Sequence, residues 1–368
     1  MIKATFNAKE MKEIIGFTAN IASQYSVDNS NTYVKVIVGK KSKIVYASRG
    51  VYLETKINLK DTSDGEFVIE PFYLEQLPSR SAETTISINK DDEGSYKMSY
   101  TNGKSKGELV IANELDAFNK SLMDASEYPS KFVTLNKSQL YNTVSKLLYK
   151  SSDNQLDRSV GLPIKIVASG KKATIYSCDS WCALMYSLDL KEKAEKCDVL
   201  TQGSLLKIAF SMTDDEMQFA SDETYTRIKS KKFDLVVPTQ ELQILDFDDF
   251  YARQGKKPKT SATFKMEDIV GALEDVSNVS NIANIDPKVE LTAKDGKITI
   301  TNTATVGKAK SVFKAKVKSD FAISIYTFWI TNFQSNFSGE IKFDLYKAAG
   351  MLTNKDESVK CIFPIMEA

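Results

Sequence analysis

Three stretches of the sequence share one pattern, a short alternating strand that runs directly into an amphipathic helix. They are IKATFN at 2–7 with a helix from Ala8, KFVTLN at 131–136 with a helix from Lys137, and SATFKM at 261–266 with a helix from Glu267. The starts lie about 130 residues apart. Strand pairs with Gly-Lys turns follow at 33–59, 164–190 and 289–317. A fixed spacing of this size indicates an internal repeat.

Each third of the chain then repeats the unit inside itself. An apolar strand precedes an expected helix at 66–69 and 71–77, at 197–200 and 204–212, and at 320–324 and 327–335. Six strand–helix–strands units predict an α+β protein with three similar domains, each made of two units. We place the domains at 1–128, 129–250 and 251–368, with polar linkers at 121–130 and 250–258.

The expected helices have an apolar face and a face that carries lysine. In 8–24 the apolar positions are Met11, Ile14, Ile15, Thr18 and Ile21, and the opposite positions are Lys9, Lys12, Gly16, Asn20 and Ser23. In 137–150 the corresponding sets are Leu140, Val144, Leu147 and Leu148, and Asn142, Lys146, Tyr149 and Lys150. A single helix of this kind is ordinary, with solvated lysines on its outer face. Equivalent helices in a repeat can instead gather their lysines into one basic track.

Composition excludes several classes of function. The 368 residues are 42% hydrophobic and 26% charged with a net charge of +1, which is typical of a globular protein and names no partner. The absence of histidine removes Ser-His-Asp and Cys-His nucleophiles and the common zinc and haem ligand sets. The start of the sequence resembles no secretory signal, and four cysteines do not make a disulfide framework. We therefore expect a cytoplasmic protein without a membrane span.

Two motifs suggest chemistry but have simpler readings. Gly103-Lys104-Ser105 resembles the end of a Walker A loop, yet Met98 stands where that loop needs glycine, so we expect a hairpin turn. Cys178 and Cys182 are four residues apart, about 13 Å along a strand, which is too far to share one metal ion. We expect packed thiols, no metal and no catalytic residue.

A run of lysines has two readings. Lys308, Lys310, Lys314, Lys316 and Lys318 fall on one parity, with Val312 as the exception. The charge can protect an edge strand against aggregation. Alternatively, the net charge of +4 in 251–368 and of −2 in 1–128, where Asp91, Asp92 and Glu93 lie, favours head-to-tail pairing of two chains.

The repeat and four local segments resemble the bacterial-type DNA polymerase sliding clamp, the β clamp. The segments are VLTQGSLLKI at 199–208, YSCDSW at 176–181, LVVP at 235–238 and the ending CIFPIM at 361–366. The resemblance implies the DNA clamp fold, in which helices line a ring and sheets face outward. The pattern covers the whole chain and is compatible with a divergent phage-encoded member.

The resemblance also implies functional residues. Positions expected to face DNA are Lys9, Lys12, Asn20, Arg80, Lys137, Lys146, Lys150, Arg158 and Lys207. Positions expected to form a groove for partner peptides are Cys178, Ser180, Trp181, Ala183, Pro238, Leu242, Ser324, Thr327, Phe363, Pro364, Ile365 and Met366. Trp181 and the apolar C-terminal strip can equally be core. Acidic residues on the helix after 266, namely Glu267, Asp268, Glu274 and Asp275, are expected near the DNA-facing side.

These observations lead to one functional hypothesis and two alternatives. The hypothesis is a non-enzymatic processivity factor without cofactors, a head-to-tail homodimer that encircles double-stranded DNA without sequence preference. A clamp-loader ATPase would open it, and short peptide motifs of that loader and of the DNA polymerase would bind it. One alternative is a repeat-built structural or virion protein with no DNA role. The other is an enzyme that uses lysines or carboxylates, for which the sequence offers no constellation.

Overall fold

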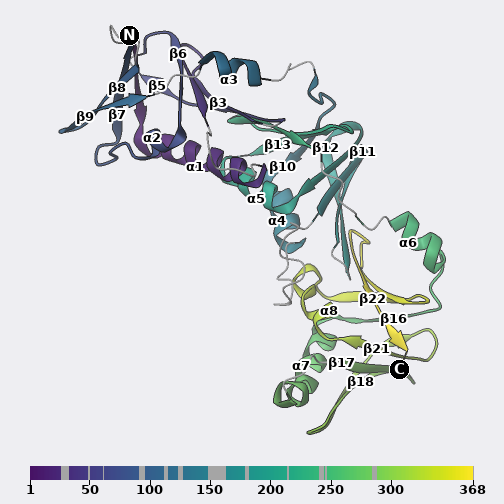
Figure 1. Ribbon diagram of the computed structural model, residues 1–368. Helices are drawn as coiled ribbons and strands as arrows, with labels where there is room; N and C mark the ends of the chain where they lie inside the picture. The colour runs from purple at the N-terminus through teal and green to yellow at the C-terminus, as the bar shows by residue number, and fades with distance from the viewer. Residues whose placement is uncertain are drawn as a thin grey trace. The chain divides into compact units, whose positions relative to one another are not determined.

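The computed structural model describes thirteen parts of the chain, which form two compact units (Figure 1). The described residues are 1–25, 33–48, 50–60, 62–90, 96–111, 115–122, 127–147, 163–178, 182–213, 215–239, 244, 247–283 and 288–367. Unit 1 consists of Met1–Lys137 and Ser204–Gln240, and unit 2 of Ser138–Gly203 and Glu241–Ala368. The middle predicted domain therefore contributes to both units, and the three-domain division stays a prediction.

Unit 1 contains two antiparallel sheets. The first has the order β5 (Leu59–Lys60), β1 (Ile2–Asn7), β7 (Glu83–Lys90), β8 (Tyr96–Asn102) and β9 (Ser105–Ile111). The second has the order β10 (Val133–Asn136), β13 (Glu216–Ser221), β14 (Tyr225–Lys229), β15 (Phe233–Pro238), β4 (Val51–Lys56), β3 (Lys43–Ser48), β2 (Val34–Val38) and β6 (Gly65–Ile69). The β15–β4 pairing joins the first and second predicted domains into one continuous sheet.

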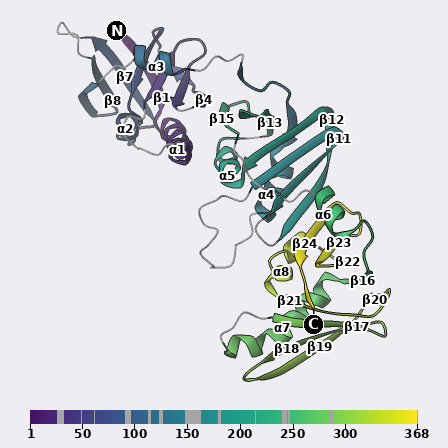
Figure 2. The same cartoon turned by 45° about the vertical axis from the view of Figure 1, so that its right-hand side comes forward.

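Unit 2 also contains two sheets, and the long β11–β12 hairpin stands out in Figure 2. The larger has the order β11 (Pro163–Cys178), β12 (Ala183–Gln202), β24 (Val359–Pro364), β23 (Ala349–Asn354), β22 (Glu340–Leu345), β16 (Thr260–Lys265) and β20 (Lys316–Val317). The smaller has the order β19 (Gly307–Lys314), β18 (Lys297–Ala304), β17 (Lys288–Lys294), β21 (Phe321–Tyr326) and β25 (Met366–Glu367). Pairing of β12 with β24 joins the second and third predicted domains.

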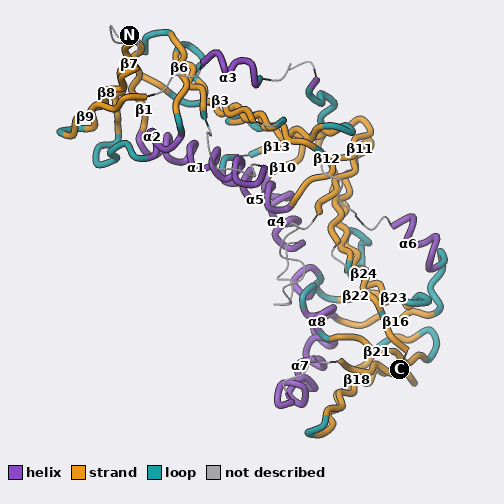
Figure 3. The backbone as a smooth tube through the Cα atoms, viewed as in Figure 1, coloured by secondary structure: helices purple, strands orange, loops and turns teal. Residues whose placement is uncertain are grey.

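Figure 3 shows that strands make up more of the described chain than helices do. They are α1 (Ala8–Tyr25), α2 (Pro71–Glu75), α3 (Leu115–Ser121), α4 (Lys137–Leu147), α5 (Gly203–Ser211), α6 (Phe247–Gln254), α7 (Met266–Ala283) and α8 (Phe328–Thr331), with a 3₁₀ turn at Gln334–Asn336. The predicted strand-to-helix step is confirmed at β1–α1, β10–α4 and β16–α7, and inside each third at β6–α2, β12–α5 and β21–α8. The α+β class is therefore correct.

Helix α1 shows why the repeated opening folds as it does. The side-chain Oδ1 of Asn7 accepts hydrogen bonds from the backbone N–H groups of Lys9 and Glu10, both at 3.0 Å. This cap satisfies donors that the first turn leaves unpaired. The five predicted apolar positions are all buried, and the opposite positions are exposed. Burial of each large aliphatic side chain contributes about 1.5–3 kcal/mol.

Two helices were not predicted, and both cover a sheet face. Helix α3 packs through Phe118 against Val45 and Val68. Helix α6, whose C-terminal half lies in the predicted linker 250–258, packs through Phe250 against Ala183 and Ile362. Figure 1 shows α3 on the opposite face of its sheet from α1 and α2. One expected linker, 250–258, thus begins in a short covering helix, whereas α3 ends where the other, 121–130, was expected to start.

The strand pairing tests two further expectations, the hairpin turn at Gly103 and the single lysine face over 308–318. The turn at Gly103 joins β8 to β9 with φ +60°, as a hairpin requires. The single lysine face over 308–318 is wrong, because β19 ends at Lys314 and β20 starts at Lys316 in the other sheet. Buried Ala315 separates the two strands. The part on β19 does lie on an edge strand, which pairs only with β18 among the described residues.

Candidate nucleic-acid interface and partner groove

The exposed side of α1 carries the first group of expected DNA-facing residues. Lys9, Lys12 and Asn20 are all exposed. Lys9 lies 3.9 Å from Glu13, a contact between two well-exposed side chains that adds little stability. Glu10 is turned away toward Asn58, whose side-chain amide donates to it at 3.3 Å. Both lysines are therefore exposed enough to meet an anion.

Arg80 lies on a turn that is fixed next to the start of α1. The side chain of Asn102, 2% exposed, accepts a hydrogen bond from the Ser81 N–H at 2.8 Å and donates to the Ser81 and Glu83 carbonyls at 2.9 and 3.0 Å. The Ala8 N–H donates to the Ala82 carbonyl at 2.8 Å. These bonds hold exposed Arg80 at the N-terminal end of α1.

A shallow hollow of about 540 Å³ lies between this turn and the first turns of α1. Lys9, Lys12, Ser79 and Ser81 line it together with one acid, Glu13, and the Lys12 ammonium donates to Ser79 Oγ at 3.2 Å. Ammonium and hydroxyl donors are the groups that contact phosphate oxygens in protein–DNA interfaces. The two serines and Asn102 were missed from the sequence, because only the fold brings 79–82 and 102 to α1.

The remaining residues that were expected to face DNA differ in how exposed they are, and some lie outside the described part of the chain. Lys207 is exposed on α5, and Figures 1 and 2 place α1, α2 and α5 along one side of the unit 1 strands. Lys137 is half-buried, and its ammonium donates to the Thr213 carbonyl, which makes it a poorer phosphate ligand than a free lysine. The backbone of Lys146 lies in α4, but its side chain lies outside the description. Lys150 and Arg158 lie outside the described residues.

The acidic residues of α7, namely Glu267, Asp268, Glu274 and Asp275, are exposed. Glu267 has a local role, since its Oε1 accepts the Gly339 N–H at 3.2 Å. Hydrogen bonds from its own backbone N–H and from Gly339 lower the pKa of the Glu267 carboxyl. Asp275 accepts the hydroxyl of Ser311 at 3.0 Å. Two of the four carboxylates, those of Glu267 and Asp275, therefore make hydrogen bonds within the third predicted domain.

The predicted groove residues at the start of β12 lie on one sheet face. Cys178 pairs with Ala183, and Ala183 pairs with Ile362 of β24. Ala183 is buried and Cys178 half-buried in the apolar cluster under α6. Ser180, Trp181 and Leu242 lie outside the described residues, and Pro238 belongs to unit 1.

The chain end divides the remaining groove residues between core and surface. Phe363 is 0% exposed and stacks parallel to Phe343, with ring centroids 6.1 Å apart, so it cannot line an open groove. Pro364, Ile365 and Met366 are half-buried. Met366 pairs with Ser324 where β25 joins β21, and the nearby Thr327 is buried. The structure therefore brings Ser324 and Met366 together and assigns Phe363 to the core.

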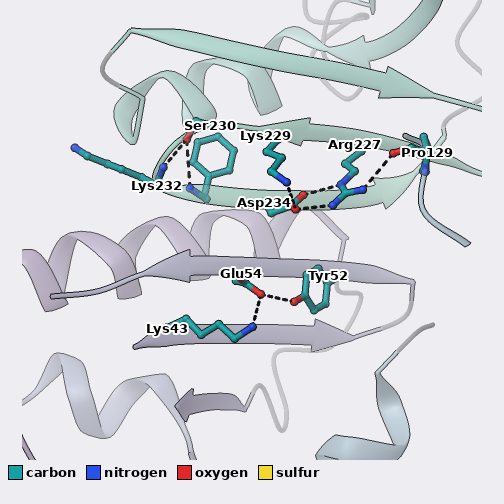
Figure 4. A network of polar contacts seen from close by, with 10 residues as sticks. Lys43, Tyr52, Glu54, Pro129, Arg227, Lys229, Ser230, Lys232 and Asp234 are labelled. Atoms are coloured by element: carbon teal, nitrogen blue, oxygen red, sulfur yellow. Dashed lines mark hydrogen bonds and ion pairs between the residues drawn. The ribbon is translucent and has the colours of Figure 1, made fainter. Parts of the chain in front are cut away.

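A charged network that was not predicted from the sequence lies at the β15–β4 junction (Figure 4). Arg227 binds Asp234 with two hydrogen bonds, of 2.8 and 2.6 Å, and its guanidinium lies 5.6 and 5.4 Å from the rings of Tyr128 and Phe132. The Asp234 hydrogen bond raises the pKa of Arg227, and burial raises the pKa of Tyr128 to about 12. On the neighbouring strands Glu54 accepts from Lys43 and Tyr52. Each ion pair lies on its own side of the joint between the first two predicted domains, and each provides a cation to one of the carboxylates, Asp234 and Glu54, that pair across it.

The cysteines and the lengths of the helices bear on metal binding and on insertion into a membrane. Cys178 ends β11 and Cys182 precedes β12, so the expectation that both lie on one strand is wrong. The four cysteines form no disulfide, and the described residues contain no group of three His, Cys, Asp or Glu that could hold a metal ion. No helix in the described part of the chain is long and apolar enough to cross a membrane.

The fold is that of bacterial sliding clamps. The chain is similar to a DNA polymerase III beta subunit from Eubacterium rectale (TM-score 0.77, 10% identity, 100% of both chains). It is similar to the C. crescentus beta sliding clamp (0.75, 14%, 100% of this chain and 99% of that one) and to the beta subunit from Streptococcus pyogenes (0.72, 17%, 100% of both). No family model and no curated protein matches the sequence. The match establishes the DNA clamp fold over the whole chain.

Proposed function

We propose that the chain is a DNA sliding clamp, a ring-shaped processivity factor that encircles duplex DNA and tethers a replicative polymerase. The observation that carries the proposal is the end-to-end correspondence with solved beta clamps, at TM-scores of 0.70 to 0.77. The protein would act in the cytoplasm and catalyse no reaction of its own. Its task would be topological, which suits a chain whose exposed cations are scattered and mostly lysine.

The DNA contacts would be made by the exposed cations of α1, α5 and the 79–82 turn. Lys9, Lys12, Arg80 and Lys207 are exposed on elements that flank one side of the unit 1 sheets. Lysine ammonium groups bind phosphate as point charges and read no base sequence. A ring that must slide needs such contacts, because they can be exchanged from one phosphate to the next.

Closure of the ring would join two copies head to tail through the free sheet edges. Strand β9 ends the small sheet of unit 1, and β19 ends the small sheet of unit 2. The outward side chains of β9 are Lys106, Glu108 and Val110, the last 64% exposed. Those of β19 include Val312, 50% exposed, and the ammonium groups of Lys308, Lys310 and Lys314. Pairing these edges would cover both valines and place lysines opposite an acid.

The partner groove would lie near the chain end. Ile365 and Met366, both half-buried, would form its accessible apolar surface with Pro364, and the fully buried Phe363 would support this surface from the core. In the C. crescentus structure a polyethylene glycol occupies a region described as the beta-motif tethering region. We propose that polymerase and clamp-loader peptides bind the corresponding surface here.

Retention on circular DNA tests the proposal directly. The protein, incubated with a matching clamp loader and ATP on nicked circular DNA, should co-elute with the circle in gel filtration. Cutting the circle once should release it, because a ring slides off an end. Light scattering should give twice the 41.1 kDa chain mass. Equal retention on cut and uncut DNA would contradict encirclement, and an open-ended polymer without DNA affinity would support a structural protein instead.

A further inference from the structure

A groove of about 600 Å³ lies beside α6, on the face of the larger unit 2 sheet that α6 covers. Tyr251 of α6, Tyr346, Met351 and the side chains of Asp344 and Thr353 line it. The groove lies entirely inside unit 2. It is distinct from the chain-end surface around Ile365 and Met366, which do not line it.

Strand register explains how the lining residues come together. Asp344 of β22 pairs with Met351 of β23, and Lys342 pairs with Thr353, which in turn pairs with Lys360 of β24. Directly paired residues, and residues two apart on one strand, point to the same face of a sheet. The carboxylate and the hydroxyl are therefore diagonal neighbours on the floor of the groove.

Both floor residues keep a buried polar atom without a hydrogen-bond partner. Asp344 is 4% exposed; its Oδ2 lies 2.9 Å from the Lys342 ammonium, whereas its Oδ1 has no partner. Thr353 is also 4% exposed, and its Oγ1 has no partner either. A buried acceptor left unpaired destabilises the fold, more so when it is charged, and a donor from a ligand would relieve that cost. Two such atoms on one groove floor indicate a ligand that donates hydrogen bonds.

The walls and the rim define the ligand further. The Tyr251 hydroxyl donates to Met351 Sδ at 3.8 Å, and the Tyr251 and Tyr346 ring centroids are 6.3 Å apart. Tyrosine faces attract planar cations, above all a guanidinium, which also offers donors in a rigid fork. Besides Asp344, the charged residues that line the groove are Lys256, Lys342, Lys360 and Glu357. Lysines therefore outnumber acids around it, which would repel an isolated cation but attract acidic neighbours of one.

We infer that this groove binds an arginine side chain of a partner protein, in a segment where acidic residues flank the arginine. The guanidinium would stack on Tyr251 and donate to Asp344 Oδ1 and Thr353 Oγ1. The flanking carboxylates would meet Lys256 and Lys360 at the rim. The inference does not depend on the clamp proposal, because the groove is complete within one chain.

Methyl NMR of the full-length protein tests the inference, with methionine labelled at its ¹³C methyl group. The probe is acetyl-EARAE-amide, and the matched peptides are acetyl-EAMAE-amide and acetyl-QARAQ-amide. The Met351 methyl signal, assigned by its loss in Met351→Leu, should shift saturably with the first peptide. It should respond at least tenfold more weakly to the second, and several-fold more weakly to the third.

Isosteric variants separate the floor atoms from general packing. Asp344→Asn and Thr353→Val should each weaken the first peptide at least tenfold, whereas Asp295→Asn and Thr303→Val, both exposed on the smaller sheet, should leave binding unchanged. Thermal midpoints within a few degrees of the parent would show that the variants fold. Equal binding of the arginine and methionine peptides, unchanged binding in both floor variants, or no shift at millimolar peptide would each overturn the inference. Failure on circular DNA with intact peptide binding would refute only the clamp proposal.

Discussion

Removing the cations at the start of α1 should make DNA binding less sensitive to salt. In the variant Lys9→Ala/Lys12→Ala/Arg80→Ala, three exposed charges disappear from each chain, and so six from a ring of two copies. Each phosphate contact contributes about −0.9 to the slope of log K against log salt concentration. If all six charges contact phosphate, the slope should become less steep by about 5. Contacts shared among many phosphates would give a smaller change in the same direction.

The assay is fluorescence anisotropy of a labelled duplex, titrated at several salt concentrations with parent and variant. The matched control is Lys3→Ala/Lys90→Ala/Lys120→Ala, which removes the same charge from exposed positions of unit 1. Lys3 alternates with buried Ala4 on β1, and Lys120 lies on α3, opposite α1. The control should keep the parental slope, and base sequence should have no effect. Equal slopes for variant and control would refute the assignment of α1 to the DNA-facing side.

Three further changes test other parts of the structure. Phe363→Ala should lower the free energy of unfolding, measured by urea denaturation, by about 3–5 kcal/mol, because loss of a fully buried ring leaves a cavity beside Phe343. Ile365→Ala, at a half-buried position, should lower it less but abolish binding of the polymerase peptide, measured by fluorescence anisotropy. Reversing the charges on β19 should shift the dimer toward monomer in light scattering, and a dimer unchanged in Lys308→Glu/Lys310→Glu/Lys314→Glu would argue against that edge. The pKa of Glu267 is lower in the folded protein than its value of about 4.3 in the unfolded chain, so the ionised carboxylate stabilises the fold at pH values above 4.3. This contribution is lost as the pH falls through the folded pKa. In Glu267→Gln the free energy of unfolding, measured by urea denaturation, should therefore fall less steeply between neutral and acid pH.

The repeated elements could be predicted because their signal is local. The apolar spacing of α1 follows the 3.6-residue period, and Asn7 supplies its cap within three residues of sequence. The exposure of Lys9, Lys12 and Asn20 follows from the same spacing. The position of Arg80 does not, because it depends on hydrogen bonds from Asn102 on a strand twenty residues away. Long-range bonds of this kind leave no mark on the local pattern.

The covering helices were hidden for a related reason. The segment of α6 carries acidic and aromatic residues, a composition that suits a polar linker as well as a short helix. Its helical state is favoured by Phe250, which packs on Ala183 and Ile362 and forms an edge contact with Tyr346 at 5.2 Å. Tertiary packing of one apolar face commonly decides the state of helices this short. The groove beside α6 could therefore not have been predicted without the sheet beneath it.

The lysines of 308–318 show the limit of counting parity along a strand. Alternation tells which side of a sheet a residue faces, but it does not tell where the chain changes its hydrogen-bonding partner. Here Lys314 pairs with Lys297 in the smaller sheet, and Lys316 pairs with Thr263 in the larger one. Buried Ala315 lies between, and its N–H donates to the Gly296 carbonyl at 3.0 Å. Only the lysines of β19 can therefore act together on one edge, and a closure surface built from all five would be split between two sheets.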